Sequence, residues 1–91
     1  MKLETQVVIE KERADFAFKE LTINDKPGAK DLYTLAKAYY DDATHFYNKN
    51  ALLEAFELYA YTWGLLDAGA RTGLFNPGKA RKHYKIEQQD F

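Results

Sequence analysis

The sequence predicts an all-α protein, an up-and-down three-helix bundle followed by a short basic C-terminal tail. Three segments repeat apolar residues at intervals of three and four, the period of a buried helix face. Clusters of turn residues separate these segments, and the connections are short, so successive helices should lie antiparallel. We therefore expect one bundle at 1–76, with helices at about 3–23, 30–48 and 51–73, and a tail at 77–91.

The first two predicted helices each carry a single apolar row. Glu10 alone interrupts the row of the first helix, and Pro27 with Gly28 marks the turn that follows. We expect these rows to face the core: Leu3, Val7, Ala14, Ala17 and Leu21, with Phe18 alongside, in the first helix, and Leu32, Ala36, Tyr39, Ala43 and Phe46 in the second.

The third predicted helix has the most regular row and a signal at each end. Asn50 is a favourable N-cap residue for its start. Gly73 suits a left-handed C-cap, and Pro77 cannot continue the helix. The apolar row between these signals should face the core: Leu52, Phe56, Tyr59, Trp63, Leu66 and Ala70.

Small residues lie at one edge of this row, at Ala60 and Gly64. An interior glycine weakens a helix by roughly 1 kcal/mol relative to alanine. We therefore expect close packing of a neighbouring helix against both positions. The same edge carries Asp67 four residues before Arg71, the favourable order for a helical ion pair. The alternative is that these two side chains bind a ligand. Gly69 has no explanation in the core pattern.

A second apolar row lies on the opposite side of the third helix. Because a helix of a three-helix bundle buries one face, this row needs a cover. We expect a second subunit, in a homodimer formed through the third helix, since twofold dimers are the commonest closed assembly. The alternative cover is the tail, through Tyr84, Ile86 and Phe91. The second row consists of Leu58, Tyr61, Leu65, Ala68 and Phe75.

The composition limits the chemistry that the protein can perform. The 91 residues include no cysteine and no serine, which excludes thiolate and serine nucleophiles, disulfides and cysteine-based metal sites. The net charge of −1 argues against the strongly basic surface of a dedicated nucleic-acid binder. No apolar run approaches the roughly 20 residues of a membrane span. We expect a cytoplasmic protein without cofactor, metal or membrane contact.

Two further patterns each allow a structural and a functional interpretation. His45 follows Asp42 by three residues, but two ligands on one helix face do not make a metal site. Tyrosines recur every seven residues beside the core row of the second helix, at Tyr33, Tyr40 and Tyr47. We interpret them as the edge of the core, with hydroxyls reaching water. The alternative is a platform on which single-stranded nucleic-acid bases stack.

Specific motifs occupy the second and third predicted helices. The pattern Y-Y-x-D-A-x-x-F covers 39–46, A-F covers 55–56, and Y-x-x-G-x-L-D-A-G-x-R-x-G-L covers 61–74. On these motifs, residues 36–75 resemble a small archaeal family known as domain of unknown function 357. The chain departs from the family in its "NKN" turn, where a Gly-Asp-like turn is usual. The resemblance implies an archaeal helical bundle and brings no known activity.

These observations lead to three functional hypotheses. The first is a non-enzymatic, self-associating or adaptor module, because the third helix is apolar on two sides and no catalytic set is assembled. The second is a protein that binds a small ligand or nucleotide through Asp42, Asp67 and Arg71. The third, which ranks last, is a single-stranded nucleic-acid binder that uses the tyrosine row and the basic tail.

Overall fold

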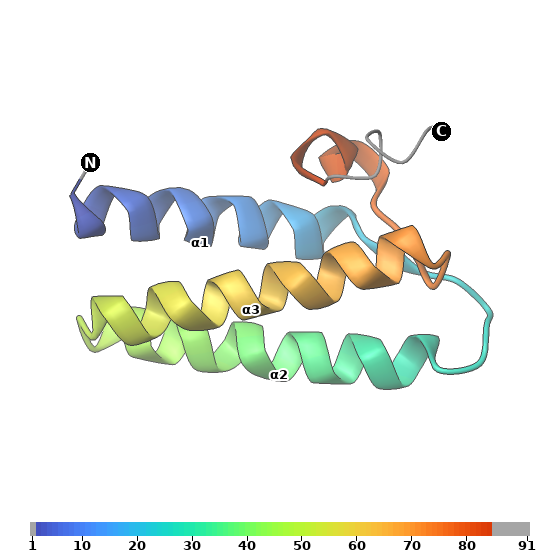
Figure 1. Ribbon diagram of the computed structural model, residues 1–91, viewed down its shortest axis with the longest axis horizontal. Helices are drawn as coiled ribbons and strands as arrows, with labels where there is room; N and C mark the ends of the chain where they lie inside the picture. Colours follow the sequence, from blue (N-terminus) through green and yellow to red (C-terminus); the bar gives the residue numbers. More distant parts are fainter. Residues whose placement is uncertain (1, 85–91) are drawn as a thin grey trace.

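Three long helices make up most of the computed structural model, which describes residues 2–84 (Figure 1). They are α1 (Leu3–Glu20), α2 (Ala29–Asn48) and α3 (Leu52–Arg71). α3 packs against both α1 and α2, whereas α1 and α2 contact each other far less. The predicted all-α helical bundle is confirmed, with α3 as its middle helix. No helix within residues 2–84 is long and apolar enough to cross a membrane.

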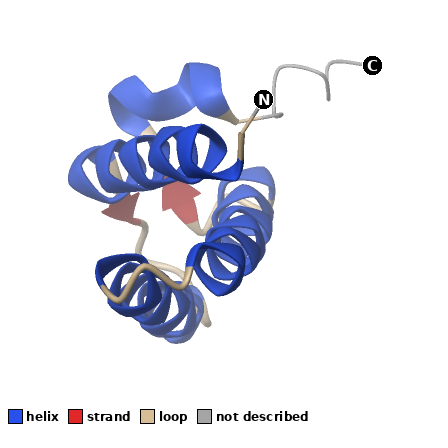
Figure 2. Ribbon diagram, turned by 90° about the vertical axis from the view of Figure 1, so that its left-hand side faces the viewer, coloured by secondary structure: helices blue, strands red, loops and turns tan. Residues whose placement is uncertain are grey.

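Two short strands tie the end of α1 to the end of α3. β1 (Thr22–Ile23) pairs antiparallel with β2 (Phe75–Asn76), and both are drawn in red in Figure 2. Leu21 is already extended, with φ −65° and ψ 137°, so α1 ends at Glu20 and the predicted end at 23 is wrong. These strands could not be predicted from periodicity, because two residues are too few for an alternating pattern.

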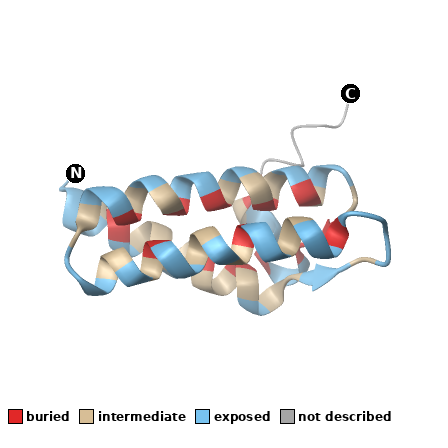
Figure 3. Cartoon of the chain, turned by 90° about the horizontal axis from the view of Figure 1, so that it is seen from below, coloured by how far each residue is buried: buried red, intermediate tan, exposed pale blue. Residues whose placement is uncertain are grey.

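The core is built largely from small side chains at the helix contacts (red in Figure 3). The apolar rows correctly predict many of the residues that are inaccessible to solvent: Val7, Ala14 and Ala17 on α1, Ala36 and Ala43 on α2, and Tyr59 and Leu66 on α3. They miss Ala55, Thr62 and Ala80, which are equally inaccessible. Alanines at these contacts let the helix backbones approach closely, and the larger rings fill the remaining space. Leu3, by contrast, lies at the exposed start of α1.

α3 ends at Arg71, two residues before the predicted end but with the predicted cap at Gly73, and its start differs from the prediction. At its end, Gly73 has a left-handed φ of 79°, the amide of Gly73 donates to the Ala70 carbonyl, and that of Leu74 donates to the Gly69 carbonyl. This is a Schellman motif, in which glycine is favoured at the left-handed position. Asn50 is not the N-cap of α3: it has a φ of 63°, donates to the Tyr47 carbonyl and terminates α2.

The start of the predicted tail folds onto the bundle as a 3-10 helix, η1 (Gly78–His83), which packs against α1. Ala80 and Tyr84 are buried, and the Tyr84 ring meets Trp63 edge-on at 5.3 Å between centroids. The tail therefore covers Trp63 on the core side of α3. Ile86 and Phe91, the other residues expected to cover α3, lie outside the described residues.

Candidate functional site

The surface of α3 away from the core is uncharged along most of its length. It carries Ala60, Tyr61, Gly64 and Ala68, all exposed, between Glu57 and Arg71 at its two ends. These six residues fall within about 100° of one another around a helix of 3.6 residues per turn, and we call them the outer face of α3.

Tyr61 is the largest side chain of the outer face and is 54% exposed. Its ring stacks on that of Tyr39 from α2, with 4.5 Å between the centroids and 28° between the planes. Leu35, one helical turn before Tyr39, is also largely exposed. α2 and α3 thus jointly present an apolar surface beside the outer face.

The structure divides the predicted self-association row between surface and interior. Tyr61 and Ala68 are exposed as expected. Leu58 and Leu65 are half-buried and pack against the two core clusters. Phe75 is only 2% exposed and belongs to the core, so its predicted place on an outer surface is wrong. The reason is that the chain turns at Gly73 and brings Phe75 back under the end of α3.

The predicted close packing at Ala60 and Gly64 is also wrong within this chain. Both residues are exposed, and a Cβ built on Gly64 would meet no atom within 4 Å. The close contact is instead at Gly69, which faces the Phe75 ring. Gly64 therefore weakens α3 by roughly 1 kcal/mol relative to alanine without any packing reason among the described residues.

The structure joins two of the three predicted ligand-binding residues and leaves the third apart. Arg71 donates to the Asp67 carboxylate at 3.2 Å, so the predicted ion pair is confirmed. Asp42 is exposed on α2 and does not line the groove that contains Asp67. The pair lies at the surface, where such contacts contribute little to stability.

A groove of about 330 Å³ lies beside the outer face, between α1, α3 and η1. Arg13 stands over the Trp63 ring, 5.0 Å from its centroid, and also contacts Glu10 at 3.2 Å and the His83 carbonyl at 3.4 Å. The Trp63 Nε1 is buried and has no hydrogen-bond partner among the described residues. The residues that line the groove are Glu10, Arg13, Phe56, Ala60, Trp63, Gly64, Asp67 and His83.

The charge of the groove depends on His83. Burial, together with the positive charges of Arg13 and Lys82, lowers the pKa of the His83 imidazole from its usual 6.5. The ring also meets Phe16 edge-on at 6.0 Å. The neutral imidazole is therefore favoured, and the charged side chains that line the groove are Glu10 and Asp67 with Arg13, which pairs with Glu10. The sequence did not reveal this groove, because it depends on how η1 folds back over α1.

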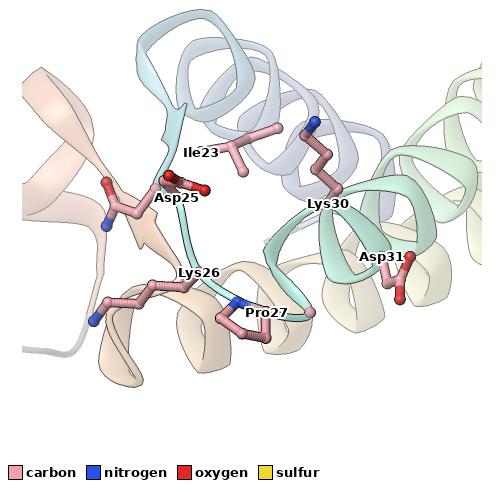
Figure 4. Close-up of a pocket in the computed structure, with 8 residues that line it drawn as sticks. Ile23, Asp25, Lys26, Pro27, Lys30 and Asp31 are labelled. Atoms are coloured by element: carbon pink, nitrogen blue, oxygen red, sulfur yellow. The ribbon is translucent and has the colours of Figure 1, made fainter.

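A second hollow, of about 550 Å³, lies in the loop before α2, at the end of the bundle where β1 and β2 pair (Figure 4). Its charged side chains point in different directions: Lys26 and Lys30 extend away from each other, and Asp31 lies on a third side (Figure 4). These groups do not converge on one point, and the hollow offers no defined binding chemistry.

The tyrosine row on α2 faces α1 and is part of the packing. The Tyr40 ring lies 4.5 Å from that of Phe18, and its hydroxyl donates to Asp15. Burial and this hydrogen bond raise the pKa of the Tyr40 phenol. Tyr33 meets Phe18 and Phe75, and Lys11 lies over the Tyr47 ring. With their rings engaged in this way, these tyrosines are a poor platform for nucleic-acid bases.

Metal chemistry has no evident site in the part of the chain described. Within residues 2–84, no group of three or more histidine, aspartate or glutamate side chains is placed to hold a metal ion. His45 and Asp42 lie on the exposed side of α2, away from the groove.

Comparison with known proteins places the chain in a family. The model of the family described as protein of unknown function (DUF357) matches residues 12–75, which run from α1 through β2. No curated protein and no solved structure gives a significant match. The family match covers most of the chain and includes the outer face of α3, and the protein therefore belongs to the DUF357 family.

Proposed function

We propose that the protein is a non-enzymatic helical module that associates with a second copy of itself through the outer face of α3. The observation that carries this proposal is Gly64. It is an interior helix glycine at an exposed position where a Cβ would meet nothing. Since the fold does not require glycine there, the residue is better explained by a partner that approaches the α3 backbone.

The surroundings of Gly64 support a protein partner. The stacked pair of Tyr39 and Tyr61, with Leu35 beside it, gives an aromatic and aliphatic surface next to the small residues. Tyrosine is enriched at protein interfaces, because a rigid ring gives a large contact area for little loss of conformational freedom. Contiguous exposed apolar surface of this kind marks interaction sites in monomeric domains.

Sedimentation equilibrium tests self-association directly. We expect a dimer for the wild type and a monomer for Tyr61→Glu, because a carboxylate in the centre of an apolar contact is left without water or a partner. Val8→Glu is the matched control: Val8 is an exposed apolar residue of α1, and its substitution should leave the dimer intact. A wild type that stays monomeric at high micromolar concentration would exclude the proposal.

A second candidate function, binding of a small ligand such as a nucleotide, is favoured by the groove beside α3. The groove combines the Trp63 side chain with the charges of Arg13 and Asp67. Trp63 is the only tryptophan of the chain, so tryptophan fluorescence reports on the surroundings of this one residue, which include the groove.

Titration with a panel of nucleotides tests this candidate. We expect a saturable change in Trp63 emission that Asp67→Asn weakens and Asp42→Asn does not, since Asp42 lies outside the groove. Equal loss in both variants would return Asp42 to the site, and no change across the panel would count against nucleotide binding.

A further inference from the structure

We propose that the two copies pair α3 against α3 in antiparallel orientation, about a twofold axis that passes beside Gly64. This pairing specifies the geometry of the proposed self-association, and it rests on that proposal. It names the partner surface as the same outer face of α3, and it specifies which residue of one copy meets which residue of the other.

The register follows from a symmetry in the outer face. Ala60 lies four residues before Gly64, and Ala68 lies four residues after it. Glu57 lies seven residues before Gly64, and Arg71 lies seven residues after it. The alanines are therefore placed equally on both sides of Gly64, and the two charged residues are placed equally with opposite sign, whereas Tyr61 has Asp67 as its counterpart three residues after Gly64.

Antiparallel pairing about Gly64 makes this pattern self-complementary. In a twofold contact, if residue i meets residue j, then j meets i. Ala60 then meets Ala68 of the partner subunit, and Glu57 meets Arg71 of the partner subunit, at both ends of the interface. The two glycines meet at the centre, where the absence of side chains lets the backbones come together.

Parallel pairing of the same face is disfavoured by its charges. It would set Glu57 against Glu57 and Arg71 against Arg71, so that both ends of the interface would repel. Antiparallel helices also place the positive end of one helix dipole beside the negative end of the other. Charge thus selects one orientation for a face whose small residues would permit either.

The existing ion pair fits within this arrangement. Arg71 already contacts Asp67 at 3.2 Å, and its side chain remains 40% exposed. A guanidinium presents five donors, so Arg71 can keep Asp67 and also receive Glu57 of the partner subunit. Glu57 is exposed on the outer face and is positioned to supply that carboxylate.

Single-cysteine cross-linking tests the register, because the chain has no cysteine of its own. A disulfide needs Cα atoms within about 7 Å of each other. Under mild oxidation Gly64→Cys should cross-link efficiently, since the two copies of position 64 meet on the axis. Ala60→Cys and Ala68→Cys should not, because each position is about 12 Å from its own copy at 1.5 Å rise per residue. An equimolar mixture of these two variants should cross-link with each other.

The same experiment separates failure of the register from failure of self-association. If all three single variants cross-link, the helices are parallel and the register is wrong although the outer face is still the interface. If the wild type is a dimer and none of them cross-links, the interface lies elsewhere. If the wild type is a monomer, both proposals fail. The structure leaves open space at Gly64, so Gly64→Cys should fold, which circular dichroism checks under reducing conditions.

Charge reversal provides a second readout of the same register. Glu57→Arg and Arg71→Glu should each raise the dimer dissociation constant at least fivefold at low salt, and the double variant should restore it. Glu12→Arg, an exposed reversal on α1, is the control and should leave the constant unchanged. If the double variant binds no better than the single ones, the pairing of Glu57 with Arg71 of the partner subunit is excluded.

Discussion

The Phe75 ring lies against the backbone of Gly69, so that no side chain fits at position 69. A Cβ built on Gly69 would stand 2.9 Å from Cγ of Phe75 and closer still to the edge of the ring. Both residues are buried, and Tyr33 meets the Phe75 ring edge-on, with 6.4 Å between the centroids. The glycine of α3 that the fold requires is thus Gly69, while Gly64 stands in open space.

The two glycines should respond oppositely to alanine. Gly69→Ala should destabilise the protein by about 1–3 kcal/mol, because the added methyl group overpacks against Phe75. Gly64→Ala should stabilise the monomer by up to roughly 1 kcal/mol, because it gains helix propensity and its methyl group meets nothing within the chain. Urea denaturation at two protein concentrations measures both effects and separates any contribution of a dimer. Equal effects of the two substitutions would contradict the contact between Gly69 and Phe75.

The ion pair of Asp67 with Arg71 should give a small coupling energy. The two side chains are partly exposed, and pairs of this type at i, i+4 contribute about 0.3–0.5 kcal/mol. In a double-mutant cycle, Asp67→Ala and Arg71→Ala should each destabilise the protein, and the double variant should lose less than their sum. Strict additivity would argue that the two residues act separately, as in a ligand site.

Features of α3 that depend on the helix alone could be predicted from the sequence, and features that depend on contacts with distant segments could not. Burial of Tyr59 and Leu66 was predictable, because helical spacing alone sets which side of α3 they occupy. The pair of Asp67 with Arg71 was predictable for the same reason. The role of Gly69 was not, because it depends on Phe75, which reaches α3 only through the turn at Gly73 and the pairing of β2 with β1.

The candidate surfaces, the outer face of α3 and the groove, also depend on contacts that the sequence pattern does not show. The exposed positions of α3 repeat with the helical period, yet the sequence could not show which of its two outward rows would be left uncovered. That choice depends on α1 and α2, which cover Leu58 and Leu65 in part and leave Ala60 and Gly64 exposed. The groove at Trp63 is formed in part by η1, so the periodicity of the helices could not predict it.

Protonation of His83 should weaken the fold at acidic pH. Its pKa in the folded protein lies below the usual 6.5, because burial and the neighbouring Arg13 and Lys82 disfavour the charged ring. The unfolded chain then binds the proton more readily than the folded protein. The contribution of neutral His83 to the free energy of unfolding is therefore fully present above pH 6.5 and is lost as the pH falls below it. The free energy of unfolding should therefore fall less between pH 7.5 and pH 5 in His83→Gln than in the wild type. Parallel pH profiles would show that the imidazole does not sense these charges.

The hydrogen bond of Tyr40 to Asp15 should stabilise the contact between α1 and α2. Tyr40→Phe removes a donor to a carboxylate, and such bonds contribute about 1.5–3 kcal/mol. We expect the low end of this range, because Lys11 also holds Asp15, at 2.8 Å. Tyr39→Phe is the matched control: it removes a neighbouring hydroxyl while keeping the ring that stacks on Tyr61, and it should change stability far less.

Tyr40→Phe should show a second effect at alkaline pH. The pKa of Tyr40 is raised from 10.0 in the folded protein, first by burial and then by the hydrogen bond to Asp15. The unfolded chain therefore releases the phenolic proton more readily, and the stabilisation present below pH 10 is lost as the pH rises beyond it. The difference in unfolding free energy between wild type and Tyr40→Phe, measured in urea, should shrink between pH 8 and pH 11. A constant difference across this interval would mean that the Tyr40 hydroxyl ionises as easily in the folded protein as in the unfolded chain.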